Sequence, residues 1–322
     1  METVTANKEL FDQLKDLATE QRNAASMKLD AETIVGVLKI INSEDKKVAL
    51  AVEEQLPYIA QAVEFVVQAF RSGGRLIYVG AGTSGRLGTL DSVECPPTYG
   101  TDSEMVQSII AGGQQAMFRS QEGAEDNENA GAAEIELKKV RSLDVVCGIA
   151  ASLRTPFVVG AVKRAKQLGA KIIYITTNPR SKLELQEFKN LAESIDVAIC
   201  PEVGPEVIMG STRMKSGTAQ KLVLNMISTA AMVRLGKVYE NMMIDLQMTS
   251  EKLKERAKRI VMTVTGIEYD QAGESLRKAG WHVKIALVMI KAGVTKEEAT
   301  KRLQEADGFV RPAIEGRPYW GL

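Results

Sequence analysis

The chain has very few of the residues that usually carry metal binding and histidine-based catalysis. Among its 322 residues the only histidine is His282, and the three cysteines, Cys95, Cys147 and Cys200, are far apart and lack CxxC spacing. These shortages argue against a Ser-His-Asp triad in the main domain and against a zinc site, and they favour a reducing compartment. We expect neither a zinc site nor a histidine-based metal site, and we interpret His282, beside Trp281, as structural.

Excess charge and long apolar runs are also missing. The 41 Lys and Arg residues balance the 41 Asp and Glu residues, so no bulk charge favours nucleic acid or an anionic membrane. No apolar run approaches the roughly 20 residues that span a bilayer. The first residues lack the basic start and apolar stretch of a signal peptide. We therefore expect a cytoplasmic protein with neither nucleic acid nor membrane as a partner.

The most informative stretch is a glycine-rich turn that follows a short apolar run. Leu76–Val79 is typical of a buried strand, and it leads through Gly82 and Gly85 into an apolar-periodic stretch. A strand, a glycine turn and a helix N-terminus together form an anion site, because free N–H groups and the helix dipole point outward. Thr83 and Ser84 add hydroxyl donors. This stretch predicts a phosphate-binding loop.

The glycine turn also fits the G-x-G-x-x-G pattern of dinucleotide-binding proteins, so a dinucleotide site is the alternative to be weighed. It requires an acidic residue about 20 positions on, at the end of the next strand. The next predicted strand, Met105–Ala111, ends in Gly112-Gly113, and Glu104 lies at its beginning. Paired hydroxyls also suit a phosphomonoester better than a pyrophosphate. We favour a phosphorylated small molecule over a dinucleotide.

From about residue 72 short apolar runs alternate with amphipathic stretches. This alternation predicts an α/β fold in which a parallel five-stranded sheet is sandwiched by helices. Ligands of such sheets bind beyond the carboxyl ends of the strands. The expected strands are Leu76–Val79, Val106–Ala111, Val145–Ala150, Ile172–Thr176 and Val197–Cys200.

Before the sheet, residues 1–70 have a helical pattern. Asp30 or Thr33 is suited to cap one helix, and Pro57 lies where a second helix can begin. The polar stretch Glu20–Asn23 lies between apolar segments, and local sequence logic alone favours a solvated loop there.

After the sheet, short helical stretches separated by glycines predict a small helical bundle. We therefore expect an N-terminal helical segment over residues 1–55, an α/β domain that binds a phosphorylated small molecule over 56–250 and a C-terminal helical domain over 251–322.

Two further strand-to-helix turns repeat the hydroxyl-rich pattern. One hydroxyl-rich turn alone is better explained by ordinary helix capping, but three on one sheet edge favour a ligand site. Arg213 and Lys215 either neutralise phosphate or decorate a helix start. The candidate ligand-binding residues of the second and third turns are Ser152, Arg154, Thr155, Ser211, Thr212 and Lys215.

Long motifs in this chain resemble those of the bacterial N-acetylmuramic acid 6-phosphate etherases of the sugar-isomerase (SIS) fold. The resemblance runs from about residue 19 to the C-terminal tail and is far more specific than a lone glycine loop. The matching stretches are Thr19-Glu-Gln-Arg-Asn23, Gly80-Ala-Gly-Thr-Ser-Gly-Arg-Leu-Gly88, Glu94-Cys-Pro-Pro-Thr98, Glu122-Gly-Ala-Glu-Asp126, Gly148–Ser152 with Arg154-Thr-Pro156, and Gly210–Leu224.

The resemblance implies a cytoplasmic homodimer, a carbon–oxygen lyase that needs no metal or cofactor. It would convert N-acetylmuramate 6-phosphate and water to N-acetylglucosamine 6-phosphate and D-lactate, a step of peptidoglycan recycling or of N-acetylmuramate catabolism. It also implies that the C-terminal domain is of the ubiquitin-associated-like helical type.

By the same resemblance two glutamates are catalytic. Glu94 would protonate the leaving lactyl oxygen, and Glu125 would remove the C2 proton. If the helix from Ser84 to Glu94 is continuous, its rise of 1.5 Å per residue separates the two by roughly 15 Å. Either the helix breaks near Gly88, or Glu94 serves the pocket of a neighbouring subunit.

The chain departs from the family pattern at Leu153, where these etherases usually have glycine. Leucine adds bulk and disfavours positive φ, so we expect a reshaped loop or a narrowed pocket.

Three other functions share parts of the pattern. A sugar-phosphate aldose–ketose isomerase often uses a histidine for ring opening. A non-catalytic sensor similar to glucokinase regulatory protein would carry two SIS domains. A DNA-binding regulator would need a basic helix-turn-helix module.

Overall fold

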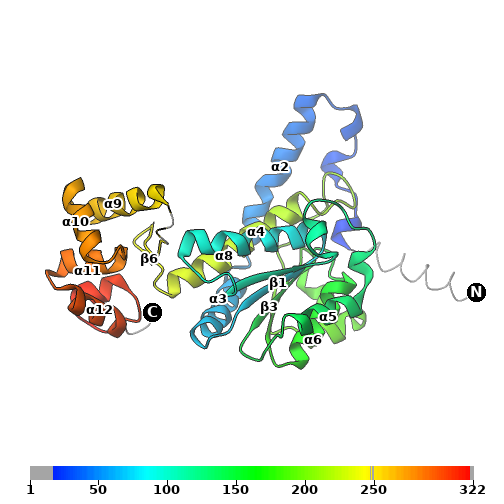
Figure 1. The fold of residues 1–322 in the computed structure, drawn as a ribbon. Helices are drawn as coiled ribbons and strands as arrows, with labels where there is room; N and C mark the ends of the chain where they lie inside the picture. The colour runs from blue at the N-terminus through cyan, green and yellow to red at the C-terminus, as the bar shows by residue number, and fades with distance from the viewer. Residues whose placement is uncertain (1–16, 247, 249, 320–322) are drawn as a thin grey trace, which may run out of the picture. The chain divides into compact units, whose positions relative to one another are not determined.

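The computed structural model describes residues 17–246, 248 and 250–319, and these form two compact units (Figure 1). The first comprises the chain up to Ser92 together with Glu104–Ile227, and the second comprises Val93–Ser103 together with the chain from Ser228 onward. The three-part division expected from the sequence stays a prediction. The helical pattern expected over residues 1–16 lies outside the described residues.

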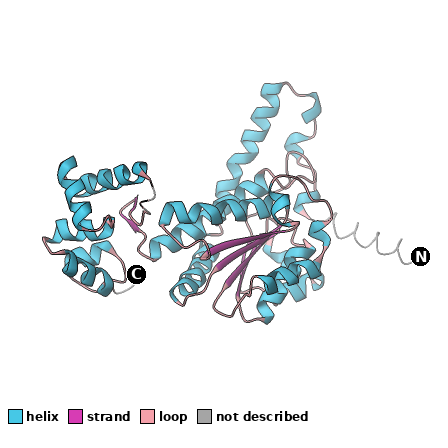
Figure 2. Ribbon diagram, viewed as in Figure 1, coloured by secondary structure: helices cyan, strands magenta, loops and turns pink. Residues whose placement is uncertain are grey.

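The first unit is built on a five-stranded sheet in which every neighbouring pair of strands is parallel (Figure 2). The strand order is β2-β1-β3-β4-β5, so the chain starts inside the sheet and moves outward in two directions. Each strand begins within one residue of the predicted position, which confirms the sequence-based fold class. The strands are β1 (Leu76–Gly80), β2 (Val106–Ile110), β3 (Val145–Ile149), β4 (Lys171–Ile175) and β5 (Val197–Ile199).

Helices cover both faces of this sheet, as its continuous apolar strands require. On one face α6 (Pro156–Gln167) packs against β1, β3 and β4 and is itself covered by α5 (Glu128–Leu137). Glycines allow these close contacts: a Cβ at Gly131 of α5 would lie 1.8 Å from the Phe157 carbonyl oxygen of α6. The short helix α7 (Lys189–Ala192) also contacts α6.

The first long helix, α2 (Ile34–Glu53), begins where the sequence indicates. Thr33 Oγ1 accepts a hydrogen bond of 3.1 Å from the Gly36 amide, so the predicted cap at Thr33 is confirmed. The next helix, α3 (Leu56–Arg71), has Pro57 in its first turn, and it packs on the sheet at β1, β3 and β5.

Helix α4 (Gly82–Tyr99) is continuous, although Pro96 and Pro97 lie in its last turn. Of the two alternatives left open for Glu94, a break near Gly88 is therefore wrong. Gly88 instead allows close packing, since a Cβ there would lie 2.9 Å from the Tyr78 Cβ on β1. Helix α8 (Lys215–Arg234) follows the third hydroxyl-rich turn.

The second unit contains the predicted helical bundle and has its own apolar core. In the part that the structure describes, the bundle has five helices, and a two-strand hairpin that the sequence analysis did not predict precedes them. The elements are α9 (Glu251–Thr265), α10 (Tyr269–Lys278), α11 (Val283–Ala292), α12 (Lys296–Glu305), α13 (Val310–Glu315), β6 (Val238–Tyr239) and β7 (Met242–Met243). Within the described chain, none of the helices has the length and apolar character needed to cross a bilayer.

Candidate functional site

A pocket of about 430 Å³ lies in the first unit, where the turns after β1 and β3 meet other loops. Six of the predicted site residues line it, which supports the expectation that the hydroxyl-rich turns converge. The lining residues are Glu20, Ala81, Ser84, Glu125, Asp126, Ala151, Ser152, Arg154, Thr155, Pro156, Gly210 and Thr212.

The first wall is the turn from β1 into α4. Gly82 adopts φ +52°, a conformation that side chains disfavour, and a Cβ at Gly80 would lie 2.6 Å from the Gly85 amide nitrogen. These glycines let the backbone fold tightly enough to present the start of α4 to the pocket. Ser84 is almost buried, and its Oγ lies 2.9 Å from Gln220 Oε1 of α8.

Gln220 is a residue that the sequence analysis did not single out. It is fully buried, and its Nε2 is among the few buried side-chain atoms without a hydrogen-bond partner in the described chain. The oxygen and nitrogen of a glutamine amide are assigned from the surrounding network. Turning this amide over would let Nε2 donate to Ser84 Oγ and leave the Ser84 hydroxyl proton for a ligand.

The second wall is the turn after β3, which contains Ser152, Arg154 and Thr155. Arg154 lines the pocket, and its Nη1 is another buried donor without a partner in the described residues. A guanidinium and hydroxyl groups at the start of α6 are suited to a phosphate or a carboxylate. The orphaned donor therefore indicates an anionic ligand in this pocket.

Leu153 lies in the same turn and adopts a left-handed backbone conformation that is typical of glycine. Its φ is +68°, its side chain is fully buried in the core under the turn, and its carbonyl accepts a 3.1 Å hydrogen bond from Tyr174. The side chain thus points into the core. Leu153 is not among the residues that line the pocket, and burial of its side chain offsets the strain of positive φ; a loop reshaped relative to the family stays a prediction.

The third wall is Glu20, at the start of the Glu20–Asn23 stretch. Gln21 and Arg22 are exposed, as a solvated loop requires, whereas Glu20 and Asn23 are partly buried, so the expected solvated loop holds only for the middle of the stretch. Ala18 to Glu20 form a short 3-10 helix (η1), and Thr19 is buried. The Ala18 amide donates to Asn178 Oδ1 at 3.1 Å, and the Thr19 carbonyl accepts from the Gly210 amide at 3.0 Å. These long-range contacts hold Glu20 at the pocket.

The fourth wall is a second short 3-10 helix (η5, Ala124–Asp126), which carries Glu125. Glu125 is exposed in the single chain, but neighbouring atoms partly desolvate its carboxyl group and raise the pKa above its ordinary value, and the negative charges of Asp126 and Glu122 raise it further. A carboxylate with a raised pKa is a better proton acceptor near neutral pH. This environment suits a general base.

Lys215 does not line the pocket. Its side chain is buried, and its Nζ donates to Glu44 Oε2 at 2.7 Å and to the Val203 carbonyl at 2.8 Å. Its backbone amide donates to Glu206 Oε2 at 2.6 Å. In this structure Lys215 therefore connects α8 to α2, and the proposed phosphate contact is not formed.

Some of the other predicted residues also lie outside the pocket lining. Gly82 and Gly85 shape the first turn, as described above, and the structure does not place Thr83 or Ser211 in the pocket wall. Glu94 is exposed on α4 and is not among the lining residues. Of the two predicted catalytic carboxylates, the pocket contains Glu125.

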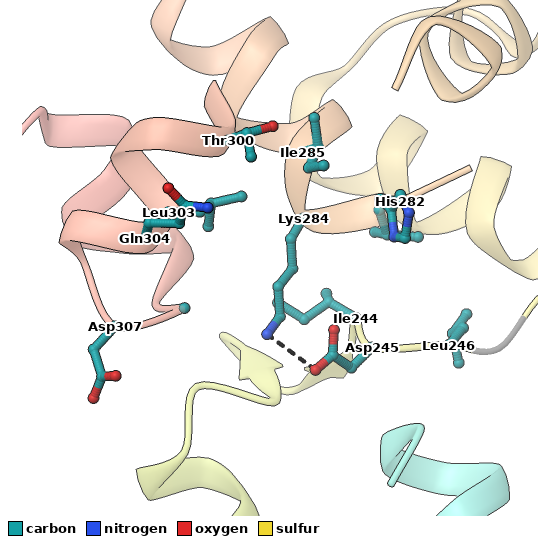
Figure 3. Close-up of a pocket in the computed structure, with 12 residues that line it drawn as sticks. Ile244, Asp245, Leu246, His282, Lys284, Ile285, Thr300, Leu303, Gln304 and Asp307 are labelled. Atoms are coloured by element: carbon teal, nitrogen blue, oxygen red, sulfur yellow. Dashed lines mark ion pairs between the residues drawn. The ribbon is translucent and has the colours of Figure 1, made fainter. Parts of the chain in front are cut away.

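The second unit has a cavity of its own, of about 460 Å³ (Figure 3). Lys284 points toward Asp245 in Figure 3, and the two form an ion pair of 3.0 Å. Lys237 also pairs with Asp245, at 2.9 Å. His282 lines this cavity at the start of α11, and no grouping of His, Cys, Asp or Glu suited to a metal ion is found among the residues that the structure describes.

The parallel sheet, the glycine turn and the anion-suited pocket define a SIS-fold protein. Residues 58–166 match the family model described as the glucokinase regulatory protein N-terminal SIS domain. Among solved structures, the phosphoheptose isomerase of Neisseria gonorrhoeae is similar at 15% identity with a TM-score of 0.45, covering 62% of this chain and 99% of that one.

Relatives with curated names show to which family within this class the chain belongs. The N-acetylmuramic acid 6-phosphate etherase of Salinibacter ruber is 62% identical, over 95% of this chain and 96% of that protein. The etherase of Clostridioides difficile is 51% identical, over 95% and 98%. The chain belongs to the N-acetylmuramic acid 6-phosphate etherase family.

Proposed function

We propose that this protein cleaves the D-lactyl ether of N-acetylmuramic acid 6-phosphate, giving N-acetylglucosamine 6-phosphate and D-lactate. The observation that carries the proposal is one pocket that combines anion donors with a carboxylate of raised pKa. Ser84, Ser152, Thr155 and Arg154 supply the donors, and Glu125 is the carboxylate. The names of the relatives agree with this chemistry.

The reaction follows from the acidity of the open-chain sugar. Direct hydrolysis of an unactivated ether is difficult near neutral pH, but the C1 aldehyde acidifies the hydrogen on C2. A base removes this proton, the C3–O bond breaks and lactate leaves with a proton from an acid. Water then adds to the unsaturated aldehyde at C3. This sequence needs a base and an acid of opposite protonation state.

Glu125 is the base in this proposal. Its place in the pocket and its raised pKa support the role. In D₂O the wild type should exchange the C2 hydrogen of N-acetylglucosamine 6-phosphate, and Glu125→Ala should abolish this exchange. Unchanged exchange in Glu125→Ala would remove Glu125 from the mechanism.

Glu94 is the acid, and we propose that it acts in the pocket of a second copy of the chain in a homodimer. Two observations support this. Helix α4 is continuous, so Glu94 lies roughly 15 Å along the helix from Ser84. Helix α2 also exposes apolar side chains that a partner would cover, with Ile34, Val35 and Leu38 each at least 59% exposed. A stable monomer with full activity would contradict the shared site.

The test is D-lactate release from N-acetylmuramate 6-phosphate with a chelator present throughout. The wild type and the control Glu64→Gln, an exposed position on α3, should release lactate, and Glu94→Ala should not. Binding of the sugar phosphate without lactate release would favour a sensor of the glucokinase regulatory protein type. Formation of a ketose would favour an isomerase.

The remaining expectations belong to this proposal. We propose a cytoplasmic enzyme that needs no metal or cofactor and has neither nucleic acid nor membrane as a partner. All three cysteines are buried and none forms a disulfide among the described residues, which supports a reducing compartment. Undiminished activity with the chelator is the expected result.

A further inference from the structure

The pocket contains a carboxylate, Glu20, to which the proposed reaction has not yet given a role. The elimination requires the open-chain aldehyde, whereas a sugar phosphate in water is mostly a ring. Opening the ring requires removal of the proton from the C1 hydroxyl and delivery of a proton to the ring oxygen. The proposed function therefore implies a second acid–base task in the same pocket.

The usual residue for such a task is histidine, and the first unit contains none. The only histidine of the chain, His282, belongs to the second unit. The titratable side chains that line the pocket are Glu20, Glu125, Asp126 and Arg154. Arginine stays protonated and cannot accept a proton. Glu125 is assigned to C2, which leaves Glu20 and Asp126.

The position of Glu20 favours it over Asp126. Asp126 lies next to Glu125 on η5, on the same wall of the pocket, whereas Glu20 comes from a separate wall. A base that acts at C1 while Glu125 faces C2 needs such a separate position. Asp126 also has an effect of its own, because its charge raises the pKa of Glu125.

The structure holds the Glu20 carboxylate in place. Thr19 Oγ1 donates to Glu20 Oε1 at 3.2 Å, while the hydrogen bonds of Ala18 and Thr19 to Asn178 and Gly210 hold the backbone. Glu20 Oε2 lies over Gly210, 3.7 Å from where a Cβ at that glycine would be. Gly210 lines the same pocket, so this oxygen faces the space that a ligand would occupy.

We propose that Glu20 is the acid–base catalyst of ring opening, an inference that rests on the proposed function. Glu20 Oε2 takes the proton from the C1 hydroxyl, the C1–O5 bond breaks as the C1=O1 double bond forms, and water protonates O5. The carboxyl group then returns its proton to solvent. Protons balance, and no oxidant or reductant is needed.

The proposal predicts a further activity that does not depend on ether cleavage. Opening and reclosing the ring interconverts the α and β anomers, so the enzyme should accelerate anomer exchange of N-acetylglucosamine 6-phosphate. NMR exchange spectroscopy measures this rate above the spontaneous rate. The wild type and the control Glu64→Gln should both accelerate it. Glu20→Gln should lower the enzymatic rate at least about 100-fold, and Glu20→Asp should restore part of it.

Several outcomes would overturn the assignment. The first is a wild-type rate of anomer exchange in Glu20→Gln. The second is a wild type that does not accelerate anomer exchange. The third is an Asp126→Asn variant that loses the exchange while Glu20→Gln keeps it. A titration of each variant with the sugar phosphate checks that binding remains. If the wild type releases lactate and Glu20→Gln keeps wild-type anomer exchange, the ring-opening inference is refuted and the etherase proposal stands. If anomer exchange depends on Glu20 but the wild type releases no lactate, the etherase proposal alone is refuted.

Discussion

The buried ion pair between Glu44 and Lys215 gives a quantitative prediction about the stability of the first unit. The Glu44 side chain is 3% exposed and the Lys215 side chain 1% exposed. Asn23 and Lys47 also bind the Glu44 carboxylate, at 2.9 and 2.5 Å. Replacing Lys215 by methionine keeps the volume but leaves a buried carboxylate without its main partner.

Removing one partner of a buried ion pair typically costs about 3–5 kcal/mol. Because Lys47 and Asn23 remain bound to Glu44, we expect Lys215→Met to lower the free energy of unfolding by about 3 kcal/mol, the low end of that range. The double variant Glu44→Gln/Lys215→Met should be destabilised by less than the sum of the two single variants. A coupling energy of about 2 kcal/mol is the expected result.

The same pair makes stability depend on pH. Burial alone would raise the pKa of Glu44, but the hydrogen bonds from Lys215, Lys47 and Asn23 outweigh it and lower the pKa from 4.5 to about 2. Because the pKa of Glu44 is lower in the folded chain than in the unfolded chain, the ionised carboxylate stabilises the fold at pH values above the unfolded pKa. This contribution is lost as the pH falls toward the folded pKa. We expect the wild type to lose about 2 kcal/mol between about pH 5 and 3 through Glu44, and Glu44→Gln to lack this loss.

Urea unfolding followed by far-UV circular dichroism measures these differences. The chain has two tryptophans, and Trp281 lies in the second unit, so the fluorescence of a variant that keeps Trp281 alone (Trp320→Phe) follows that unit separately and serves as an internal reference. The reasoning would be refuted if both single variants lost less than about 1 kcal/mol and their effects simply added.

Three further predictions follow from the pocket. Leu153→Ala should be about 1 kcal/mol less stable than Leu153→Gly, because alanine keeps the strain of φ +68° and glycine removes it; denaturant unfolding checks this order, and a more stable alanine variant would contradict it. Glu122→Gln removes a charge that raises the pKa of Glu125, so the acidic limb of kcat/KM against pH should move to lower pH; an unmoved limb would argue against Glu125 as the base. Gln220→Met should weaken binding of the sugar phosphate at least about tenfold by removing the partner of Ser84, measured by titration against the control Glu64→Gln, and unchanged affinity would show that Ser84 binds without Gln220.

The sheet and its first two turns could be predicted because their causes are local. A strand buried on both faces is an unbroken apolar run, and Gly82 has to adopt a positive φ within the turn itself. Ser84, Ser152 and Thr155 follow their strands directly, so the edge of the sheet brings them together. These features leave a pattern over a few consecutive residues.

Glu20, Gln220 and Lys215 could not be placed in this way, because their partners are distant in the sequence. The Ala18 amide bonds with Asn178, 160 residues away, and Lys215 pairs with Glu44, 171 residues away. A polar stretch such as Glu20–Asn23 looks the same whether it faces solvent or a pocket wall. Only the positions of its partners in space distinguish the two, and periodicity contains no information about them.

Leu153 is a position at which the local rule on positive φ is incomplete without the tertiary packing. Positive φ costs an L-residue about 1–2 kcal/mol, which on its own favours a reshaped loop. Full burial of a leucine side chain contributes about 1.5–3 kcal/mol, and the Leu153 carbonyl also accepts the hydrogen bond from the buried Tyr174 hydroxyl. Because these gains match or exceed the strain, leucine can hold the positive φ between Ser152 and Arg154. The turn after β3 is thus held by the core packing beneath it, where a glycine would hold it by backbone freedom alone.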